Sequence, residues 1–169
     1  IYILAISDDA IERTAAALPP LDNQLLVHTS GSVPLEVLLP YSENTGVFYP
    51  LQTLNKNRNA DFKSIPICIE SDSQENLAKL GALAKSISDQ VYELDSRARM
   101  AAHIAAVFAG NFSNHMYALS KQILAQHGLP FELISPLIIE TAQRTKDQLP
   151  DESQTGPAVR EDMKTIEKH

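Results

Sequence analysis

Short apolar runs alternate with helical patterns through the first half of the chain. The spacing of Ile11, Ala15 and Leu18 predicts a helix after the first apolar run. Ser73 is a typical N-cap for a second helix further along. Strands that alternate with crossover helices are typical of a mostly parallel sheet. The apolar runs predict its strands at about residues 1–6, 25–28, 46–49, 65–70 and 90–93.

The second half of the chain has helical periodicity throughout. Residues 95 to about 126 contain no proline and one glycine, which predicts one long helix that ends near Gly128. A second helix is predicted over about 131–146. A loop over 150–157 and a third helix that begins at Pro157 and runs to about Ile166 complete the prediction.

The predicted long helix carries a wide apolar stripe. Its apolar members are Met100, Ile104, Val107, Phe108, Phe112, Met116, Leu119 and Ile123. A stripe of this width is typical of a helix that is buried on more than one side. His103, Asn111, Asn114 and His115 lie within the stripe or at its edge. They are either hydrogen-bonded core residues or members of a site, and four polar residues together on one side favour a site.

Polar residues follow three of the predicted strands directly. These segments are residues 7–9 (Ser-Asp-Asp), 28–32 (His-Thr-Ser-Gly-Ser) and 49–53 (Tyr-Pro-Leu-Gln-Thr). Ligands of parallel sheets bind at the carboxyl ends of strands, so the three segments predict one cleft. Each segment is also compatible with an ordinary loop, and the two aspartates are equally compatible with helix capping.

A hydroxyl and a guanidinium meet near the start of the predicted third helix. Thr155, Gly156 and Arg160 are suited to hold a carboxylate or a phosphate, because helix N-termini and arginine both attract anions. The same residues are compatible with a capped surface helix and an ion pair. Arg97 and Arg99 allow the same two interpretations.

Composition and charge limit the classes of partner that the protein could bind. The 169 residues carry a formal charge of −7 without a basic run, which argues against a nucleic acid or an anionic membrane and favours small molecules or other proteins as partners. No stretch approaches the roughly 18 apolar residues of a membrane span. The single cysteine, Cys68, lies in an apolar run and predicts a buried strand position in a reducing compartment, with the cytoplasm as the default.

Several familiar catalytic motifs are missing from the sequence. It contains no HExxH, no CxxC pair, no P-loop and no GxSxG, and we expect no metal site. None of its six glycines forms the GxGxxG loop that holds the phosphates of a dinucleotide.

Five strings in order nevertheless resemble a known family. They are residues 5–11, 28–32 and 49–53, Arg99 with 102–115, and 155–158 with Arg160, Asp162, Thr165 and His169. The chain resembles bacterial Rossmann-like oxidoreductases with a C-terminal helical domain of unknown function (domain of unknown function 2520). These are related to pyrroline-carboxylate reductase, prephenate dehydrogenase and 6-phosphogluconate dehydrogenase-like proteins.

The resemblance implies an α/β Rossmann-like parallel sheet followed by an all-helical domain similar to the C-terminal domain of 6-phosphogluconate dehydrogenase. Residues 1–94 would be the second half of a domain that binds NADP or NAD. Residues 95–169 would close the substrate cleft and form a homodimer. The abrupt start on an apolar run and the missing glycine loop lead us to expect an N-terminal half of the sheet that is not in this chain, and poor cofactor binding by these residues alone.

The resemblance also suggests roles for single residues. Ser7, Asp8, His28, Thr29 and Ser30 would line the cofactor side of the cleft. Residues for the substrate would be Pro50, Gln52, Asn114, Thr155 and Arg160. Many relatives supply a catalytic Lys and Asn from the long helix, whereas this chain offers His103 and Asn111. That departure puts Lys-dependent proton transfer in doubt, although a histidine can act as acid or base near neutral pH.

The leading hypothesis is an NAD(P)-dependent oxidoreductase that moves a hydride between nicotinamide and a small, anionic substrate. His103 would be the general acid or base, and Asn111 and His115 would orient the substrate. Arg160, near Thr155, would hold the anionic group. Two alternatives remain open: a non-catalytic Rossmann-like module that senses a ligand, and a scaffold that dimerises through its helices.

Overall fold

The chain folds into two compact units in a computed structural model that describes residues 1–55, 57, 59–153, 155–157 and 159–168. The first unit comprises residues 1–114 and the second residues 115–169. Residue 95, where the sequence predicts a second domain to begin, is the N-cap of a helix inside the first unit.

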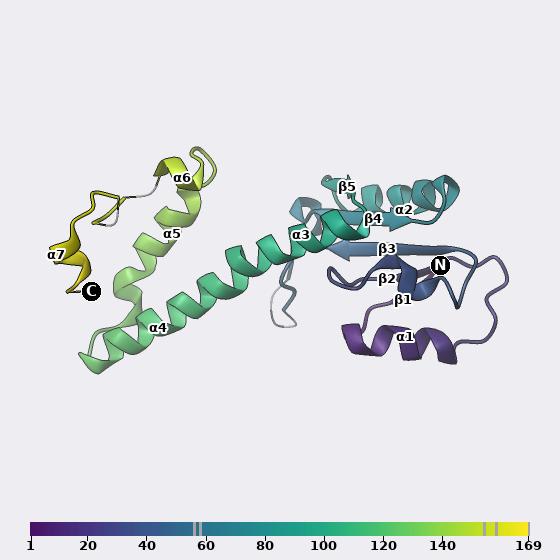
Figure 1. Cartoon of the computed structure of the whole chain (residues 1–169), viewed down its shortest axis with the longest axis horizontal. Helices are drawn as coiled ribbons and strands as arrows, with labels where there is room; N and C mark the ends of the chain where they lie inside the picture. The colour runs from purple at the N-terminus through teal and green to yellow at the C-terminus, as the bar shows by residue number, and fades with distance from the viewer. Residues whose placement is uncertain (56, 58, 154, 158, 169) are drawn as a thin grey trace. The chain divides into compact units, whose positions relative to one another are not determined.

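The first unit contains a five-stranded sheet, as the apolar runs predicted (Figure 1). The strands lie side by side in chain order: β1 (Tyr2–Leu4), β2 (Leu26–His28), β3 (Thr45–Pro50), β4 (Ile67–Ser71) and β5 (Val91–Glu93). Neighbouring strands are parallel except β3 and β4, which pair antiparallel. The sheet is therefore mostly parallel, and the chain turns back on itself once, between β3 and β4.

Two helices follow strands in the positions that the sequence predicted. Helix α1 (Asp8–Ala17) follows β1, and α2 (Gln74–Ile87) follows β4. The Ser73 side chain accepts a hydrogen bond from the backbone N–H of Asn76 and so caps α2, as its sequence position indicated. Two short 3₁₀ turns, η1 (Leu35–Leu38) and η2 (Phe62–Ser64), lie in the connections.

Each face of the sheet has its own core. Because side chains alternate along a strand, Leu25 and Val27 point to one face and Leu26 to the other. On the first face Leu25, Val27 and Ile69 pack against Leu80 of α2. On the second face Leu26 packs with residues of α1 and η1. Cys68 of β4 is buried as a free thiol, which confirms its predicted strand position.

The predicted long helix is helical throughout but not uniform. It consists of α3 (Ser96–Ala106), a π-helical segment η3 (Val107–Phe112) and α4 (Ser113–Gln126). The Asp95 side chain accepts from the backbone N–H of Ala98 and caps α3. A π-turn holds more residues than an α-turn, so the regular α-helical spacing from which the stripe was inferred does not continue beyond Ala106.

The prediction that the apolar stripe is buried was wrong for this chain. Phe108, Phe112, Met116 and Ile123 are 63%, 48%, 53% and 61% exposed. Periodicity shows that one face of a helix is apolar, whereas burial also requires an element that packs on that face.

The second unit contains only helices among its described residues. After most of α4 it continues with η4 (Phe131–Ile134), α5 (Ser135–Arg144), α6 (Pro150–Ser153) and α7 (Met163–Ile166). Pro136 lies in the first turn of α5, where a proline is tolerated. The short helix α6 occupies part of the predicted loop at 150–157.

The third helix is shorter than the sequence predicted. It begins at Met163 and not at Pro157, because Glu161 has a φ of 53° and a right-handed helix cannot pass through that backbone conformation. The Asp162 side chain then caps α7 by accepting from the backbone N–H of Thr165. Among the described residues, none of the helices combines the length and the apolar character that a membrane crossing needs.

Candidate functional site

The carboxyl ends of three strands meet at one edge of the sheet. Leu4 of β1 pairs with His28 of β2, and β3 runs parallel to β2 and ends at Pro50. The segments after these strands, which include Ser7, Thr29 and Gln52, therefore begin at the same edge. The predicted cleft corresponds to this edge, where ligands of parallel sheets bind.

Hydrogen bonds within the loop after β2 fix its shape. The Ser30 hydroxyl is buried and accepts from the backbone N–H groups of Ser32 and Val33, at 3.1 and 3.0 Å. The Ser32 hydroxyl donates to the carboxylate of Asp8, which ties this loop to the first turn of α1. Ser30 thus holds the loop, and Asp8 presents a carboxylate beside it. Ser7 is the N-cap residue of α1, although its side chain makes no capping bond.

His28 is completely buried and keeps one nitrogen without a partner. Its Nδ1 accepts a hydrogen bond from the backbone N–H of Ser30 at 3.1 Å, so the ring proton is on Nε2. Nε2 has no hydrogen-bond partner in the described part of the chain. Burial, with the nearby Arg99 guanidinium, lowers the pKa of His28 to about 4. The ring is therefore a neutral donor whose N–H is unsatisfied.

Tyr49 and His103 form a hydrogen-bonded pair beside the same loop. The Tyr49 hydroxyl lies 3.0 Å from His103 Nδ1, and the two rings meet edge to face with centroids 5.9 Å apart. Gly31 provides the room for this pair. A Cβ atom at Gly31 would lie 2.6 Å from Tyr49 Cζ and 2.7 Å from His103 Nδ1, closer than side chains pack.

An ion pair attaches α3 to the sheet and so positions His103. Arg99 is 1% exposed and its guanidinium binds the Glu70 carboxylate of β4 and the carbonyl of Val33. Ser96, at the start of α3, donates its hydroxyl to the same Glu70. Arg99 lies one helical turn before His103 on α3. Of its two sequence interpretations, the ion pair is the one found in the structure.

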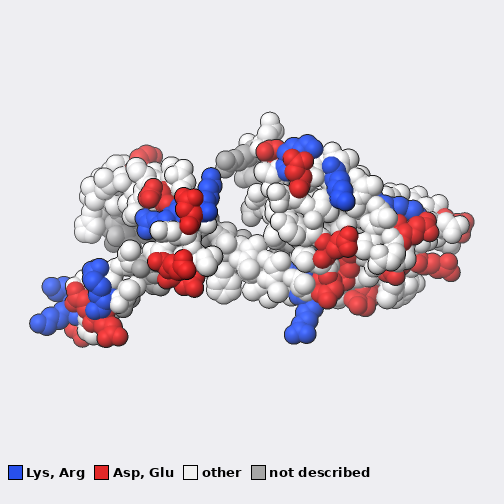
Figure 2. Space-filling view, turned by 90° about the horizontal axis from the view of Figure 1, so that it is seen from above, with Lys and Arg blue, Asp and Glu red and all other residues white. Residues whose placement is uncertain are grey.

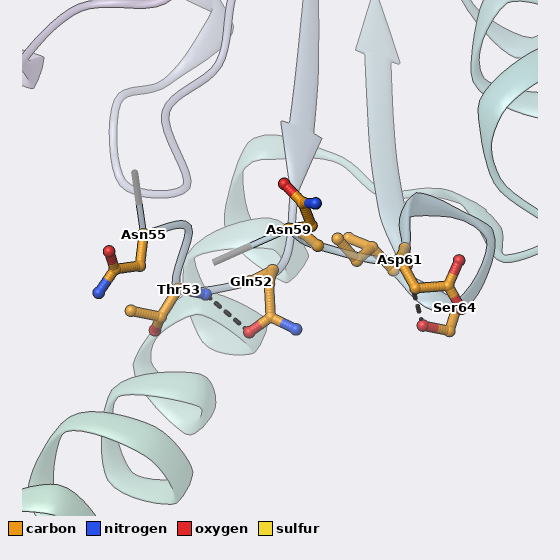
Figure 3. A pocket seen from close by; sticks show the side chains of 8 residues that line it. Gln52, Thr53, Asn55, Asn59, Asp61 and Ser64 are labelled. Atoms are coloured by element: carbon orange, nitrogen blue, oxygen red, sulfur yellow. Dashed lines mark hydrogen bonds between the residues drawn. The ribbon is translucent and has the colours of Figure 1, made fainter. Parts of the chain in front are cut away.

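A cavity of about 740 Å³ opens between the segment after β3 and the helix that carries His103. Tyr49, His103, Gln52, Thr53 and Asn111 are its polar lining residues. Leu51, alanines of α3 and residues of the π-helical segment supply the apolar remainder. Three residues singled out from sequence, His103, Gln52 and Asn111, therefore share one cavity. Figure 3 shows Gln52 and Thr53 on the segment after β3.

Other residues singled out from sequence lie elsewhere. Pro50 ends β3 and is half-buried, and Asn114 is exposed at the end of the first unit. His115, Thr155 and Arg160 are exposed residues of the second unit. Their predicted roles remain predictions.

Two site residues were not identified as such from the sequence. The sequence analysis included Tyr49 and Gly31 only as members of the polar segments 49–53 and 28–32. The close fit of Gly31 against Tyr49 and His103 requires the whole fold, because His103 is 54 residues from Tyr49 in the chain. Among the described residues, no group of three or more His, Cys, Asp or Glu could hold a metal ion.

Charge on the surface is mixed. Figure 2 shows that described Lys and Arg residues (blue) are scattered between Asp and Glu residues (red) on the face it presents. The two signs do not separate on that face, in keeping with the sequence, which has no basic run.

Comparison with families and structures adds three findings. The family model described as Domain of unknown function (DUF2520) matches residues 65–169. A protein from Bacteroides fragilis with the name putative NADP oxidoreductase is 42% identical, with a TM-score of 0.89 over 99% of this chain. A protein from Thermotoga maritima is 27% identical, with a TM-score of 0.80 over 98% of this chain.

A more distant structure shares the fold alone. It is a reductive aminase from Aspergillus terreus in complex with NADPH and ethyl levulinate, 13% identical, with a TM-score of 0.63 over 85% of this chain and 52% of that one. This chain spans 66% of the length of both the Bacteroides and the Thermotoga protein. A search of curated proteins finds no match.

Proposed function

This chain belongs to the DUF2520 family, and we propose that it is part of an NAD(P)-dependent oxidoreductase that moves a hydride between nicotinamide and a small, anionic carbonyl or imino compound. The observation that carries the proposal is the Tyr49–His103 pair, placed in a cavity beside the carboxyl ends of β2 and β3. The Rossmann-like fold and the name of the Bacteroides relative support it. The cytoplasm is the proposed compartment, because Cys68 is the single cysteine and is a buried free thiol.

The strand-end residues fit the nicotinamide side of such a cofactor. His28 has a buried N–H without a partner, and Ser7, Thr29 and Asp8 offer hydroxyls and a carboxylate at the same sheet edge. Neutral amides and sugar hydroxyls are recognised by donors and acceptors of this kind. When bound, the cofactor would supply or accept the hydride. Ser30 would contribute indirectly, because its hydroxyl fixes the shape of the loop after β2.

His103 is the proposed general acid and base. Its Nδ1 is occupied by Tyr49, which leaves Nε2 for the substrate. When the ring is charged, Nδ1–H donates to the phenol oxygen and Nε2–H can protonate a carbonyl oxygen or an imine-derived nitrogen. In the reverse direction the Nε2 lone pair accepts that proton. Burial raises the pKa of Tyr49, so its hydroxyl stays protonated at neutral pH. The hydroxyl can therefore donate to Nδ1 of a neutral His103 ring or accept from Nδ1–H of a charged one.

Neutral amides and a guanidinium would orient the substrate. Gln52 and Asn111 line the cavity with His103 and can hydrogen-bond the reacting group. We propose that Asn114 binds the substrate and that His115 orients it. Thr155 and Arg160 would hold the anionic end, from this chain or from a partner copy.

The test uses the complete gene product, because this chain spans only part of its relatives. NADPH and NADH are titrated by fluorescence, and turnover is then measured with a panel of 2-oxo and imino acids. The His103→Ala variant should lose turnover and keep cofactor binding. Wild-type protein that binds cofactor but turns over none of the panel would favour the ligand-sensing module. Absence of cofactor binding by the complete protein would overturn the proposal.

We also propose a homodimer formed through the helical residues 95–169. The exposed apolar side chains of this part support it: Ile123, Leu133 and Leu137 are 61%, 61% and 64% exposed. Sequestering such residues from water is the usual driving force for subunit association. Sedimentation velocity should give a dimer for the complete protein and a monomer for Ile123→Glu. A monomer at high wild-type concentration would contradict this proposal and also the scaffold alternative.

A further inference from the structure

The helix that carries His103 changes its turn at the wall of the cavity. It is α-helical as far as Ala106, π-helical over Val107–Phe112 and α-helical again from Ser113. The α-helical part contributes His103 to the cavity, and the π-helical segment contributes Asn111. π-turns are rare and occur mostly as single turns inside α-helices, frequently at functional sites. The change of turn therefore coincides with the place where the helix supplies its two polar cavity residues.

The π-helical segment places Asn111 on the same side of the helix as His103. In a continuous α-helix each residue turns by about 100°, so these two residues, eight positions apart, would point about 80° away from each other. With its i→i+5 hydrogen bonds a π-turn holds about 4.4 residues, and each residue turns by only about 82°. With this smaller angle after Ala106, Asn111 comes to lie within about 10° of the direction of His103.

The exposed residues of the helix agree with this rotation. Ile104, Phe108 and Phe112 are 48%, 63% and 48% exposed and lie on the side of the helix away from the cavity. The rings of Phe108 and Phe112 meet edge to face with centroids 4.8 Å apart, so they are neighbours on this outer side. In a continuous α-helix Asn111, seven positions after Ile104, would point within about 20° of it and so toward the outer side.

Two contacts support the π-helical segment where it borders the cavity. The Ser113 hydroxyl donates to the carbonyl of Phe108 at 3.4 Å, five residues earlier, which is the spacing of a π-turn. A Cβ atom at Gly110 would lie 4.0 Å from Thr53 Oγ1, an ordinary van der Waals distance. The helix therefore reaches the segment after β3 at the residue next to Asn111.

We propose that the π-helical segment Val107–Phe112 is a positioning element of the site: it turns Asn111 from the outer side of the helix into the cavity, where the amide orients the substrate toward Nε2 of His103. The inference rests on the proposed function, because Asn111 is assigned there to the substrate. It adds that the turn of the helix, and not the position of Asn111 in the sequence alone, makes this contact. The amide offers both a donor and an acceptor to the reacting group.

Two one-residue deletions in the complete protein test the role of the turn. Each removes one exposed phenylalanine and breaks the same ring pair. In each, a continuous α-helix from Ala106 would bring Ser113 to within about 30° of its present direction. Deletion of Phe108 should change the direction of Asn111 by only about 10°, because one residue fewer precedes it. Deletion of Phe112 should turn Asn111 by about 90°, out of the cavity.

The kinetics of the two deletions should differ. Deletion of Phe112 should lower kcat/KM for a substrate from the oxo-acid panel about tenfold, as for one lost hydrogen bond, whereas deletion of Phe108 should keep it near the wild-type value. Asn111→Ala should lower kcat/KM in wild type and in the Phe108 deletion, and should have no further effect in the Phe112 deletion. Gly110→Asn added to the Phe112 deletion returns an amide to the cavity side and should restore activity. Equal losses in the two deletions would overturn the proposal.

A distance measurement separates this inference from the proposed function. Nitroxide labels are attached at Gln52→Cys and Asn111→Cys in a background without other cysteines, and their spin–spin broadening is measured by electron spin resonance. Broadening should be kept in the Phe108 deletion and lost in the Phe112 deletion. This result in a protein without turnover would support the positioning role and contradict the proposed function. Equal broadening in the two deletions, together with turnover of the wild type, would overturn the positioning role and leave the function standing.

A wild-type label pair covers the case in which the Phe112 deletion does not fold. Labels at Gln52→Cys and Phe112→Cys should show weaker broadening than labels at Gln52→Cys and Asn111→Cys, because Phe112 lies on the outer side of the helix. Broadening that is equal or stronger for the pair with Phe112→Cys would overturn the proposal.

Discussion

The Tyr49 hydroxyl lies 3.0 Å from Nδ1 of His103, and Gly31 packs against both side chains. Tyr49 follows a buried residue of β3, Phe48, which points into the core on the α2 side of the sheet. Alternation along the strand therefore sends Tyr49 to the opposite face. There it meets α3, which the Arg99–Glu70 ion pair attaches to the sheet. The orientation of the His103 ring thus depends on a strand, a loop glycine and a helix at once.

Removing the Tyr49 hydroxyl should impair His103. In Tyr49→Phe the ring of His103 loses its partner at Nδ1, and we expect kcat/KM of the complete protein to fall about tenfold, as for one lost hydrogen bond. Steady-state kinetics with NADPH and a substrate from the oxo-acid panel measure it. A double-mutant cycle is the control. If Tyr49 acts through His103, Tyr49→Phe adds nothing in the His103→Ala background. Equal effects in both backgrounds would assign Tyr49 another role.

A methyl group at Gly31 should disturb the pair directly. The added Cβ would lie 2.6 Å from Tyr49 Cζ, so Gly31→Ala should destabilise the fold by about 1–3 kcal/mol, as overpacking does, and lower activity. Gly81→Ala is the matched control. Its Cβ would meet only Ile69 Cδ1, at 3.6 Å, in the middle of α2, where alanine favours the helix by about 0.5–1 kcal/mol. Urea unfolding should therefore give changes of opposite sign. Unchanged stability and activity in Gly31→Ala would show that the rings of Tyr49 and His103 can move apart.

The sheet was predictable because its signals are local. Each predicted strand is an apolar run that the structure confirms to within about two residues at either end. Ser73 likewise caps α2 through a bond to Asn76, three residues away. Such features need only neighbouring residues, which a single sequence displays.

The site was predictable only in part, because its decisive contacts join distant segments. Gln52 was identified because it follows a predicted strand, and Asn111 because it lies on the predicted long helix. Both line the cavity with His103. The partner of His103 was not identified, since nothing near residue 103 indicates Tyr49. Glu70, 29 residues from Arg99, was also not identified, so the role of Arg99 stayed open. The π-helical segment was not predicted because the sequence analysis assumed a regular α-helix from residue 95 to about 126.

Breaking the buried ion pair should cost much more than breaking an exposed one. Arg99→Met leaves the Glu70 carboxylate, which is 13% exposed, without its counter-charge, and should lower the free energy of unfolding by about 3 kcal/mol. Lys79→Ala breaks the exposed pair with Glu75 on α2 and should cause no measurable change. The urea midpoints of both variants provide the comparison. Similar midpoints would show that water reaches Glu70 when Arg99 is removed.

The buried ring of His28 should make stability depend on pH. Its pKa is lowered from 6.5 to about 4, mainly by burial, so between these values the unfolded chain binds a proton that the folded chain does not. Stability from this residue is complete above pH 6.5 and is lost as the pH falls toward 4, by about 3 kcal/mol in all. The carboxylates of the protein also make stability depend on pH, but they are the same in wild type and in the histidine variants. A comparison of these proteins therefore isolates the contribution of His28. Urea unfolding at pH 7.5 and pH 5 should show a smaller loss for His28→Gln than for wild type. His127→Gln, at an exposed position, should behave as wild type. Equal losses in all three proteins would mean that the His28 ring takes up its proton without unfolding, with water or another group reaching its buried Nδ1 or Nε2.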